Sequence, residues 1–335
     1  MARWLAVPLA LGLSMAARAD APAPEADEKP ESRPWSLDLT VHDFGLGIGN
    51  SKHVDGLRLN FRDSAPYTVH GISVTIWGAE KDKGGGEITG LALGLPVAAA
   101  ASLTGLALGG GVQVEKSLDG VGVGILGVGS GGGLHGIFLG GLGMGTGGDI
   151  AGLAVGGLGA GSGGNMSGIV IGGLGAGCGG NLTGLAVGGL GVGAGGYVRG
   201  IVIGGLGVGA GGNLTGLAIG GLGVGAGDSI KGVAIAGLGV GSPWIEGFVA
   251  GLGVGGNDVR GLVLAPAYFH VPEDGLLTGV SISAFNRILG EQHGLVIGII
   301  NYAGSLHGVQ LGLINYAGNN RSGLKLLPIA NAHFD

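Results

Sequence analysis

The residues most able to do chemistry in this 335-residue chain are eight histidines, one cysteine and a few carboxylates. No histidine lies at a metal-ligand spacing from a Cys, Asp or Glu partner. The histidines are His42, His53, His70, His135, His270, His293, His307 and His333. The candidate carboxylates of the less regular C-terminal part are Asp258, Glu273, Asp274 and Glu291. No set of nucleophile, base and orienting group can be assembled from them, so we predict no catalytic, cofactor-binding or metal site and no enzymatic activity. A secreted hydrolase built on residues 257–335 is the enzymatic alternative.

Two of these groups have structural interpretations. Cys178 is the only cysteine, so no intramolecular disulfide can form. In the repeat described below, its place is otherwise held by Ser, Thr or Ala, which predicts a packing position for a small residue. His293 and His307 each directly precede the glycine of a repeat unit, so we expect the two rings to stack at one corner of the fold.

Matches to short glycine and asparagine motifs carry little functional weight in this chain. Gly-x-Gly-x-x-Gly arises by chance where 85 of 335 residues are glycine, and no helix or later acidic residue accompanies it. Asn165, Asn181 and Asn213 match the N-glycosylation acceptor, but all three belong to one duplicated corner of the repeat.

A sixteen-residue repeat from about residue 118 to residue 242 dominates the sequence. One unit reads Asn181-Leu-Thr-Gly-Leu-Ala-Val-Gly-Gly-Leu-Gly-Val-Gly-Ala-Gly-Gly196. Its fourth place is always glycine: Gly120, Gly136, Gly152, Gly168, Gly184, Gly200, Gly216 and Gly232. So short a fixed period predicts stacked units, each of which buries its apolar face on the next. Looser units continue through Gly56, Gly71, Gly90 and Gly105 and through Gly247, Gly261, Gly279, Gly294, Gly308 and Gly323.

The spacing of apolar residues within a unit predicts two short strands. Leu185 and Val187 are two apart, which keeps them on one face of a strand, whereas odd steps at Gly188–Gly189 and around Gly200 flip the face. Glycine adopts turn dihedrals at no steric cost, so we place corners there. Two aligned columns of apolar residues follow: Leu126, Leu142, Leu158, Leu174, Leu190, Leu206, Leu222 and Leu238, and Ile137, Leu153, Ile169, Leu185, Ile201, Leu217 and Val233. Polar places gather at one corner: Asp149, Asn165, Asn181, Tyr197, Asn213 and Ser229, beside His135, Ser167, Thr183, Arg199, Thr215 and Lys231.

We therefore predict an all-β, glycine-rich repetitive β-solenoid with about 16 residues per coil. Residues 35–335 form a single repeat domain, with strict repeats over about 118–242 and irregular capping repeats over 35–117 and 243–335. The alternative is a transmembrane antiparallel β-barrel, in which each unit is one strand of about eleven residues plus a turn. Alternation of neighbouring units favours the barrel, whereas the face flips and the lack of a polar lumen face favour the solenoid.

Composition and the first residues predict an exported protein. Residues 1–19 have the features of a secretory signal peptide, with Arg3, a short apolar stretch and Ala17-Arg18-Ala19. Residues 20–34 read as a disordered, acidic, proline-rich leader. The net charge is −6 and no basic patch occurs, so nucleic-acid binding is not expected. Between residues 121 and 256 only five residues are charged, which suggests a nearby membrane or a packed assembly: Asp149, Arg199, Asp228, Lys231 and Glu246.

The C-terminal units resemble a known type of repeat. Residues 294–301 read Gly-Leu-Val-Ile-Gly-Ile-Ile-Asn and residues 308–315 read Gly-Val-Gln-Leu-Gly-Leu-Ile-Asn, and each is followed by Tyr-Ala-Gly. This is similar to the repeat of bacterial surface-repeat proteins, and the clear match covers about the last fifty residues. Between residues 120 and 255, Ala, Gly or Val replaces the Gln and Asn of that repeat. The resemblance implies a bacterial envelope or surface location and supplies no site residues.

The resulting hypothesis is a non-enzymatic, exported bacterial envelope or surface repeat protein with a structural or interaction role. Its expected location is the outer membrane, the cell surface or the periplasm. Self-association, other envelope components and membrane association are the partners we consider. The alternative function is an outer-membrane β-barrel pore.

Overall fold

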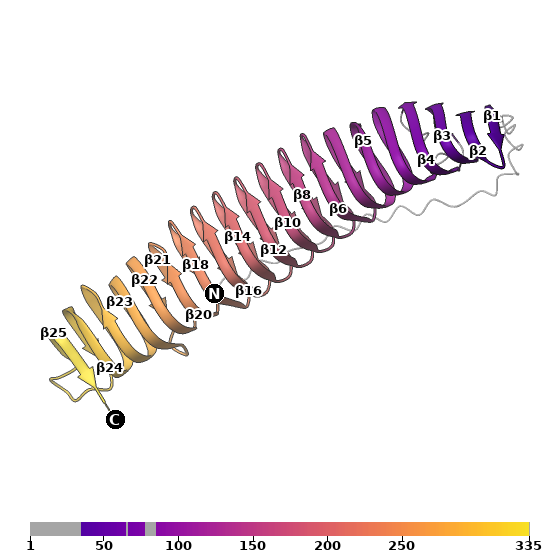
Figure 1. Cartoon of the computed structure of the whole chain (residues 1–335). Coiled ribbons are helices and arrows are strands. Elements are labelled where there is room, and N and C mark those ends of the chain that lie inside the picture. The colour runs from indigo at the N-terminus through magenta and orange to yellow at the C-terminus, as the bar shows by residue number, and fades with distance from the viewer. Residues whose placement is uncertain (1–34, 65, 78–84, 335) are drawn as a thin grey trace, which may run out of the picture. The chain divides into compact units, whose positions relative to one another are not determined.

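The computed structural model describes residues 35–64, 66–77 and 85–334, which fold as a β-solenoid (Figure 1). The predicted signal peptide (1–19) and leader (20–34) lie outside the described residues. No helix among those described is long and apolar enough to cross a membrane. The first coils contain β1 (Ser36–Val41), β2 (Phe44–Gly49), β3 (His53–Arg62), β4 (Thr68–Trp77) and β5 (Glu87–Ser130).

The regular coils alternate a longer and a shorter strand. They contain β6 (Gly133–Gly140), β7 (Gly143–Thr146), β8 (Ile150–Gly156), β9 (Gly159–Ser162), β10 (Met166–Gly172), β11 (Gly175–Cys178), β12 (Leu182–Gly188), β13 (Gly191–Ala194), β14 (Val198–Gly204), β15 (Gly207–Ala210), β16 (Leu214–Gly220), β17 (Gly223–Ala226), β18 (Ser229–Ala236), β19 (Gly239–Gly241), β20 (Trp244–Ala250) and β21 (Gly253–Gly255). The last coils contain β22 (Asp258–Val271), β23 (Leu276–Ile297), β24 (Ile300–Ala317) and β25 (Leu326–His333).

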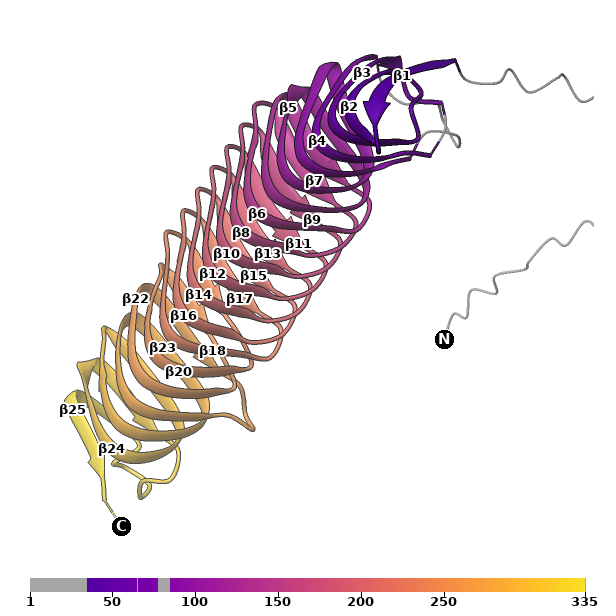
Figure 2. The same cartoon turned by 45° about the vertical axis from the view of Figure 1, so that its right-hand side comes forward.

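Each strand of a regular coil pairs in parallel with its equivalent one coil away (Figure 2). Ile169 of β10 pairs with Leu185 of β12, and Gly175 of β11 pairs with Gly191 of β13, so both walls keep the sixteen-residue offset. The predicted solenoid and its period are confirmed. Among the described residues, antiparallel pairs occur only at the two ends, between β1 and β2 and between β24 and β25.

The antiparallel barrel alternative is wrong, because adjacent units of the repeat are parallel coils and not hairpins. The alternation of neighbouring units, which favoured the barrel, has another physical basis. It changes an inward-facing residue, Val170 in one coil and Ala186 in the next, and both side chains are buried. A barrel pore therefore has no support in this fold.

The glycine at the fourth place of each unit sets the shape of the longer strand. Gly184 has a φ of +115°, and a Cβ built on it would lie 2.1 Å from the carbonyl oxygen of Gly168. Only glycine tolerates both the dihedral and the contact. This conformation lets Thr183 and Leu185, on either side of it, both face outward. The same positive φ recurs at each predicted unit glycine. Gly323 is the exception to the stack, because it lies in the turn before β25 with open space around it.

Inward side chains from the two strands of each coil form a narrow core. In one coil these are Leu182 and Ala186 from β12 and Val192 and Ala194 from β13. The predicted leucine and isoleucine columns are aligned, but they lie outside this core. The inward positions hold small residues such as Ala186 and Val192 and larger ones such as Leu182 and Met166.

Candidate functional site

The outer face of the longer strands is an apolar wall. We define the apolar wall as two columns: Ile137, Leu153, Ile169, Leu185, Ile201, Leu217 and Val233, and Leu139, Val155, Ile171, Val187, Ile203, Ile219 and Ile235. Ile169 is 43% exposed and Ile201 is 45% exposed, so these side chains are half in water rather than covered. Contiguous apolar area of this kind usually marks an interaction surface.

A leucine ridge follows the corner after the apolar wall. It consists of Leu126, Leu142, Leu158, Leu174, Leu190, Leu206, Leu222, Leu238 and Leu252. Backbone hydrogen bonds hold it in register, as where the amide of Leu206 donates to the carbonyl of Leu190 at 2.6 Å. Each side chain is 47–58% exposed. The ridge therefore extends the apolar surface around the corner of the solenoid.

The outer face of the shorter strands is a glycine wall, which carries no side chains through the regular coils. We define it by the outward glycine pairs such as Gly175 and Gly177 of β11 and Gly191 and Gly193 of β13. A Cβ on Gly193 would meet nothing within 4 Å. The wall is therefore flat backbone, open to solvent.

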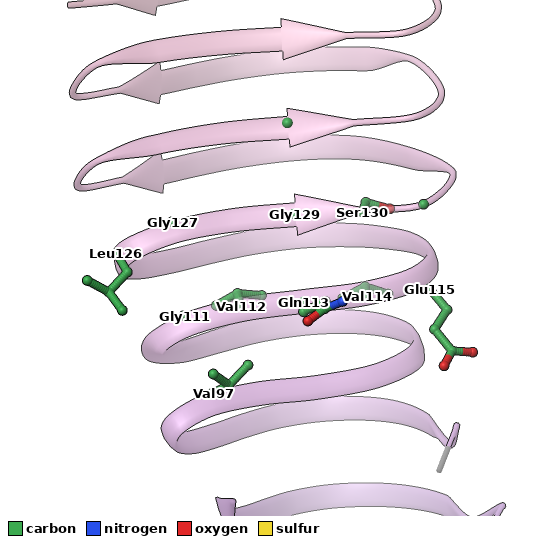
Figure 3. Close-up of a pocket in the computed structure, with 12 residues that line it drawn as sticks. Val97, Gly111, Val112, Gln113, Val114, Glu115, Leu126, Gly127, Gly129 and Ser130 are labelled. Carbon is green, nitrogen blue, oxygen red and sulfur yellow. The ribbon is translucent and has the colours of Figure 1, made fainter. Parts of the chain in front are cut away.

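A trough of about 740 Å³ lies where the glycine wall begins (Figure 3). Gly127 and Gly129 form part of its floor, Leu126 lies at one corner and Glu115 at the other. Gln113 is its central polar side chain. Its lining includes one hydroxyl, that of Ser130, and a single carboxylate, that of Glu115.

The residue before each unit glycine lies on an edge of the apolar wall, where polar side chains of neighbouring coils pair. The Nδ1 of His135 lies 2.9 Å from the Oδ1 of Asp119, and the Nζ of Lys231 lies 3.6 Å from the Oε2 of Glu246. All four side chains are about half exposed, so each pair contributes little to stability. The charge that the sequence concentrates at one corner thus lies along one edge of the wall.

The predicted polar corner forms a ladder of hydrogen bonds. The Oδ1 of Asn165 accepts from the backbone amide of Asn181 at 2.9 Å, and the Oδ1 of Asn181 accepts from the amide of Tyr197 at 3.0 Å. The asparagine side chains therefore satisfy turn amides of the next coil. This role explains Asn at the corner without a ligand or a modification.

Cys178 faces inward at the small-residue column. It is 9% exposed and aligns with Ser162 and Ala194 in the neighbouring coils. Its thiol donates to the carbonyl of Gly180 at 3.6 Å. Burial raises the pKa of the Cys178 thiol, which lowers its thiolate fraction at neutral pH.

His293 and His307 lie together as predicted, with ring centroids 4.6 Å apart, but their planes are tilted by 37° and not stacked face to face. The ring of His333 from β25 lies 6.0 Å from that of His307. The Nε2 of His293 is 3.1 Å from a carboxylate oxygen of Glu291. Within the described ranges, no group of three His, Cys, Asp or Glu side chains is placed to hold a metal ion.

The other C-terminal carboxylates are not brought together. Asp258 pairs with Arg260 in its own strand, at 3.2 Å between Oδ1 and Nε. Glu273 and Asp274 are exposed in the segment between β22 and β23. These positions do not assemble the acid and base that a hydrolase would need.

Sequence reasoning missed a second hollow, of about 460 Å³, at the C-terminal end of the glycine wall. Phe285, Arg287, Tyr302 and Tyr316 are among its lining residues. The sequence does contain a signal for it. Aligned by coil, bulky side chains occupy the two columns that are glycine in all the regular coils.

Comparison of the chain with protein-family models, curated proteins and solved structures found no match.

Proposed function

We propose that the chain is a non-enzymatic, exported bacterial envelope or surface repeat protein whose apolar wall and leucine ridge associate with a second copy. The observation that carries the proposal is the continuous apolar surface with charge confined to one edge. At the strand spacing of about 4.8 Å, the nine leucines of the ridge extend about 40 Å. An apolar area of that length is more than a soluble monomer usually leaves in water.

The surface fits a second copy better than a lipid surface. A second solenoid has the same spacing between coils, so its side-chain columns stay in register with these along the whole contact. Membrane-lying surfaces are usually flanked by several lysines and arginines. Here the only cations between residues 121 and 256 are Arg199 and Lys231, and Lys231 is paired with Glu246.

The test of association introduces the same charge at two outward positions of neighbouring coils. We expect Ile201→Lys, in the centre of the apolar wall, to convert the oligomer of the full chain to monomer. Thr215→Lys is the matched control, because the equivalent position one coil on is already Lys231. Sedimentation velocity at micromolar concentration measures both variants. A monomeric wild-type protein, or equal dissociation by both variants, would contradict the proposal.

The location is tested separately by fractionating bacterial cells that express the full chain. We expect the protein in the envelope or at the surface, with accessibility to protease added outside intact cells distinguishing the latter. Recovery in the cytoplasmic fraction would contradict export and would leave the association result unaffected.

A further inference from the structure

The hollow at the C-terminal end of the glycine wall is formed by a change of residue type at fixed positions in the coil. Gly253 of β21 aligns with Tyr268, which aligns with Phe285 and then with Ile300. In the second column, Gly255 aligns with His270, Arg287 and Tyr302. The same two columns that are bare backbone in the regular coils therefore carry large side chains here.

The rings in these columns are ordered against one another. Tyr302 and Tyr316 stack with centroids 4.8 Å apart and an angle of 9° between their planes. Tyr268 contacts Phe285 at 5.6 Å between centroids. Leu326 of β25 pairs in register with Tyr316 and closes the far end of the hollow. The hollow of about 460 Å³ falls in the range of small-molecule sites, about 300–1,000 Å³.

Arg287 is the one charged residue that lines the hollow. Arg287 is exposed and forms no ion pair or hydrogen bond with any described residue. The phenol hydroxyls of Tyr302 and Tyr316 likewise donate to no group in the described part of the chain. None of the residues lining the hollow is acidic. The remaining lining is mostly aromatic or aliphatic, including Phe285, Ile300 and Ile314.

We propose that this hollow binds an anionic amphiphile, a molecule with one acidic head and an apolar tail. Arg287 holds the carboxylate or phosphate head through charge-assisted hydrogen bonds, and the two phenol hydroxyls are placed to donate to it. The tail lies on Phe285 and the isoleucines. Residues that only capped the last coil could all be apolar. An unpaired guanidinium beside free hydroxyls is instead suited to binding an anion.

The site is independent of the proposed association, because it lies on the opposite wall in different coils. Ile201→Lys is therefore expected to retain binding even where it abolishes the oligomer. Failure of one proposal does not imply failure of the other.

The experiment is calorimetric titration of the full chain with decyl phosphate and with decanoate, each below its micelle concentration. Inorganic phosphate tests the head alone, and decyl maltoside tests the tail alone. We expect saturable binding of one anionic amphiphile per chain and at least tenfold weaker binding to either incomplete probe. Comparison of the two anionic probes distinguishes a phosphate head from a fatty carboxylate.

The variants locate that binding. Arg287→Gln removes the charge and keeps a polar, hydrogen-bonding side chain, and we expect at least tenfold weaker binding. Tyr302→Phe and Tyr316→Phe together remove the hydroxyls and are expected to weaken binding less. Arg199→Gln, on the edge of the apolar wall, is the matched control and should bind as wild type. Circular dichroism establishes that each variant is folded. Unchanged binding by Arg287→Gln, equal weakening by Arg199→Gln, or equal affinity for decyl maltoside would overturn the proposal.

Discussion

The regular coils and the C-terminal coils share a backbone path but differ in what fills and covers it. In the regular coils the core is aliphatic, as at Ala186 and Val192, and the wall of short strands is bare glycine. In the C-terminal coils a buried asparagine ladder enters the core, where the Nδ2 of Asn286 donates to Asn301 at 2.8 Å. The same coils carry rings and Arg287 outside. The stack therefore depends on the unit glycines and the parallel register, which leaves other positions free to acquire binding chemistry.

The largest expected effect concerns the glycine that both regions share. Gly184→Val should destabilise the fold by roughly 3–5 kcal/mol, because it combines a strained positive φ with overlap on the Gly168 carbonyl. Gly193→Ala, on the glycine wall, should change stability by no more than about 0.5 kcal/mol, because nothing lies near the added Cβ. Hydrogen exchange in the adjacent coils measures both. Similar costs at the two glycines would refute this account of the coil.

A smaller effect separates the two regions directly. Asn301→Leu removes the donor at 2.7 Å from the Oδ1 of Asn315 and leaves that buried oxygen without a side-chain donor. The expected cost is about 2–3 kcal/mol. Asn165→Ala, at the exposed corner of the regular coils, should cost about 0.5–1 kcal/mol. Denaturant melts followed in each region test the difference, and equal costs would show that the buried ladder has no special weight.

The smallest effect is expected at Cys178. Cys178→Ala should change stability by less than about 1 kcal/mol, because Ala194 and Ala210 hold the same column in the next coils. In the wild type, burial and the raised thiol pKa should make labelling slow at neutral pH and faster as the pH rises or the coil opens. Rapid labelling of the folded protein at neutral pH would contradict the packing role.

Much of the fold could be predicted because its determinants are local and repeated. The period fixed the register, and the step at Gly188–Gly189 located one corner correctly. The corner predicted around Gly200 is wrong, because that glycine lies inside β14, where its positive φ changes the face without a turn, and the second corner lies at Gly195–Gly196. The contact between the rings of His293 and His307 followed from their shared position before a unit glycine. The same logic extended one unit too far, to Gly323, because spacing alone does not distinguish a coil from a reversed end strand.

Other features depend on information that spacing does not carry. A step of two places Leu185 and Val187 on one face of a strand without indicating whether that face is inside. In the structure Ala186, between them, faces the core, and Leu185 and Val187 face outward. Likewise, the buried contact of Arg58 with Asp63, at 2.7 Å in the first coils, involves charged residues that resemble surface residues in sequence.

The C-terminal hollow was missed for a related reason. Tyr268, Arg287 and Tyr302 are separated by unequal spacings, and the register shifts between Ala265 and Tyr268 and between Ile288 and Glu291 hide their alignment. Only the pairing of the strands reveals that they occupy the glycine columns.

The parallel register has a consequence for how such a molecule can change over time. Each coil presents to the next the same backbone groups that it receives from the one before. An in-frame duplication or loss of one sixteen-residue unit therefore leaves both reversed end strands with suitable neighbours. It alters the span between the two ends by one increment of about 4.8 Å. The number of regular coils therefore sets the distance between the two ends, and recombination between repeats can change that number without altering the end coils.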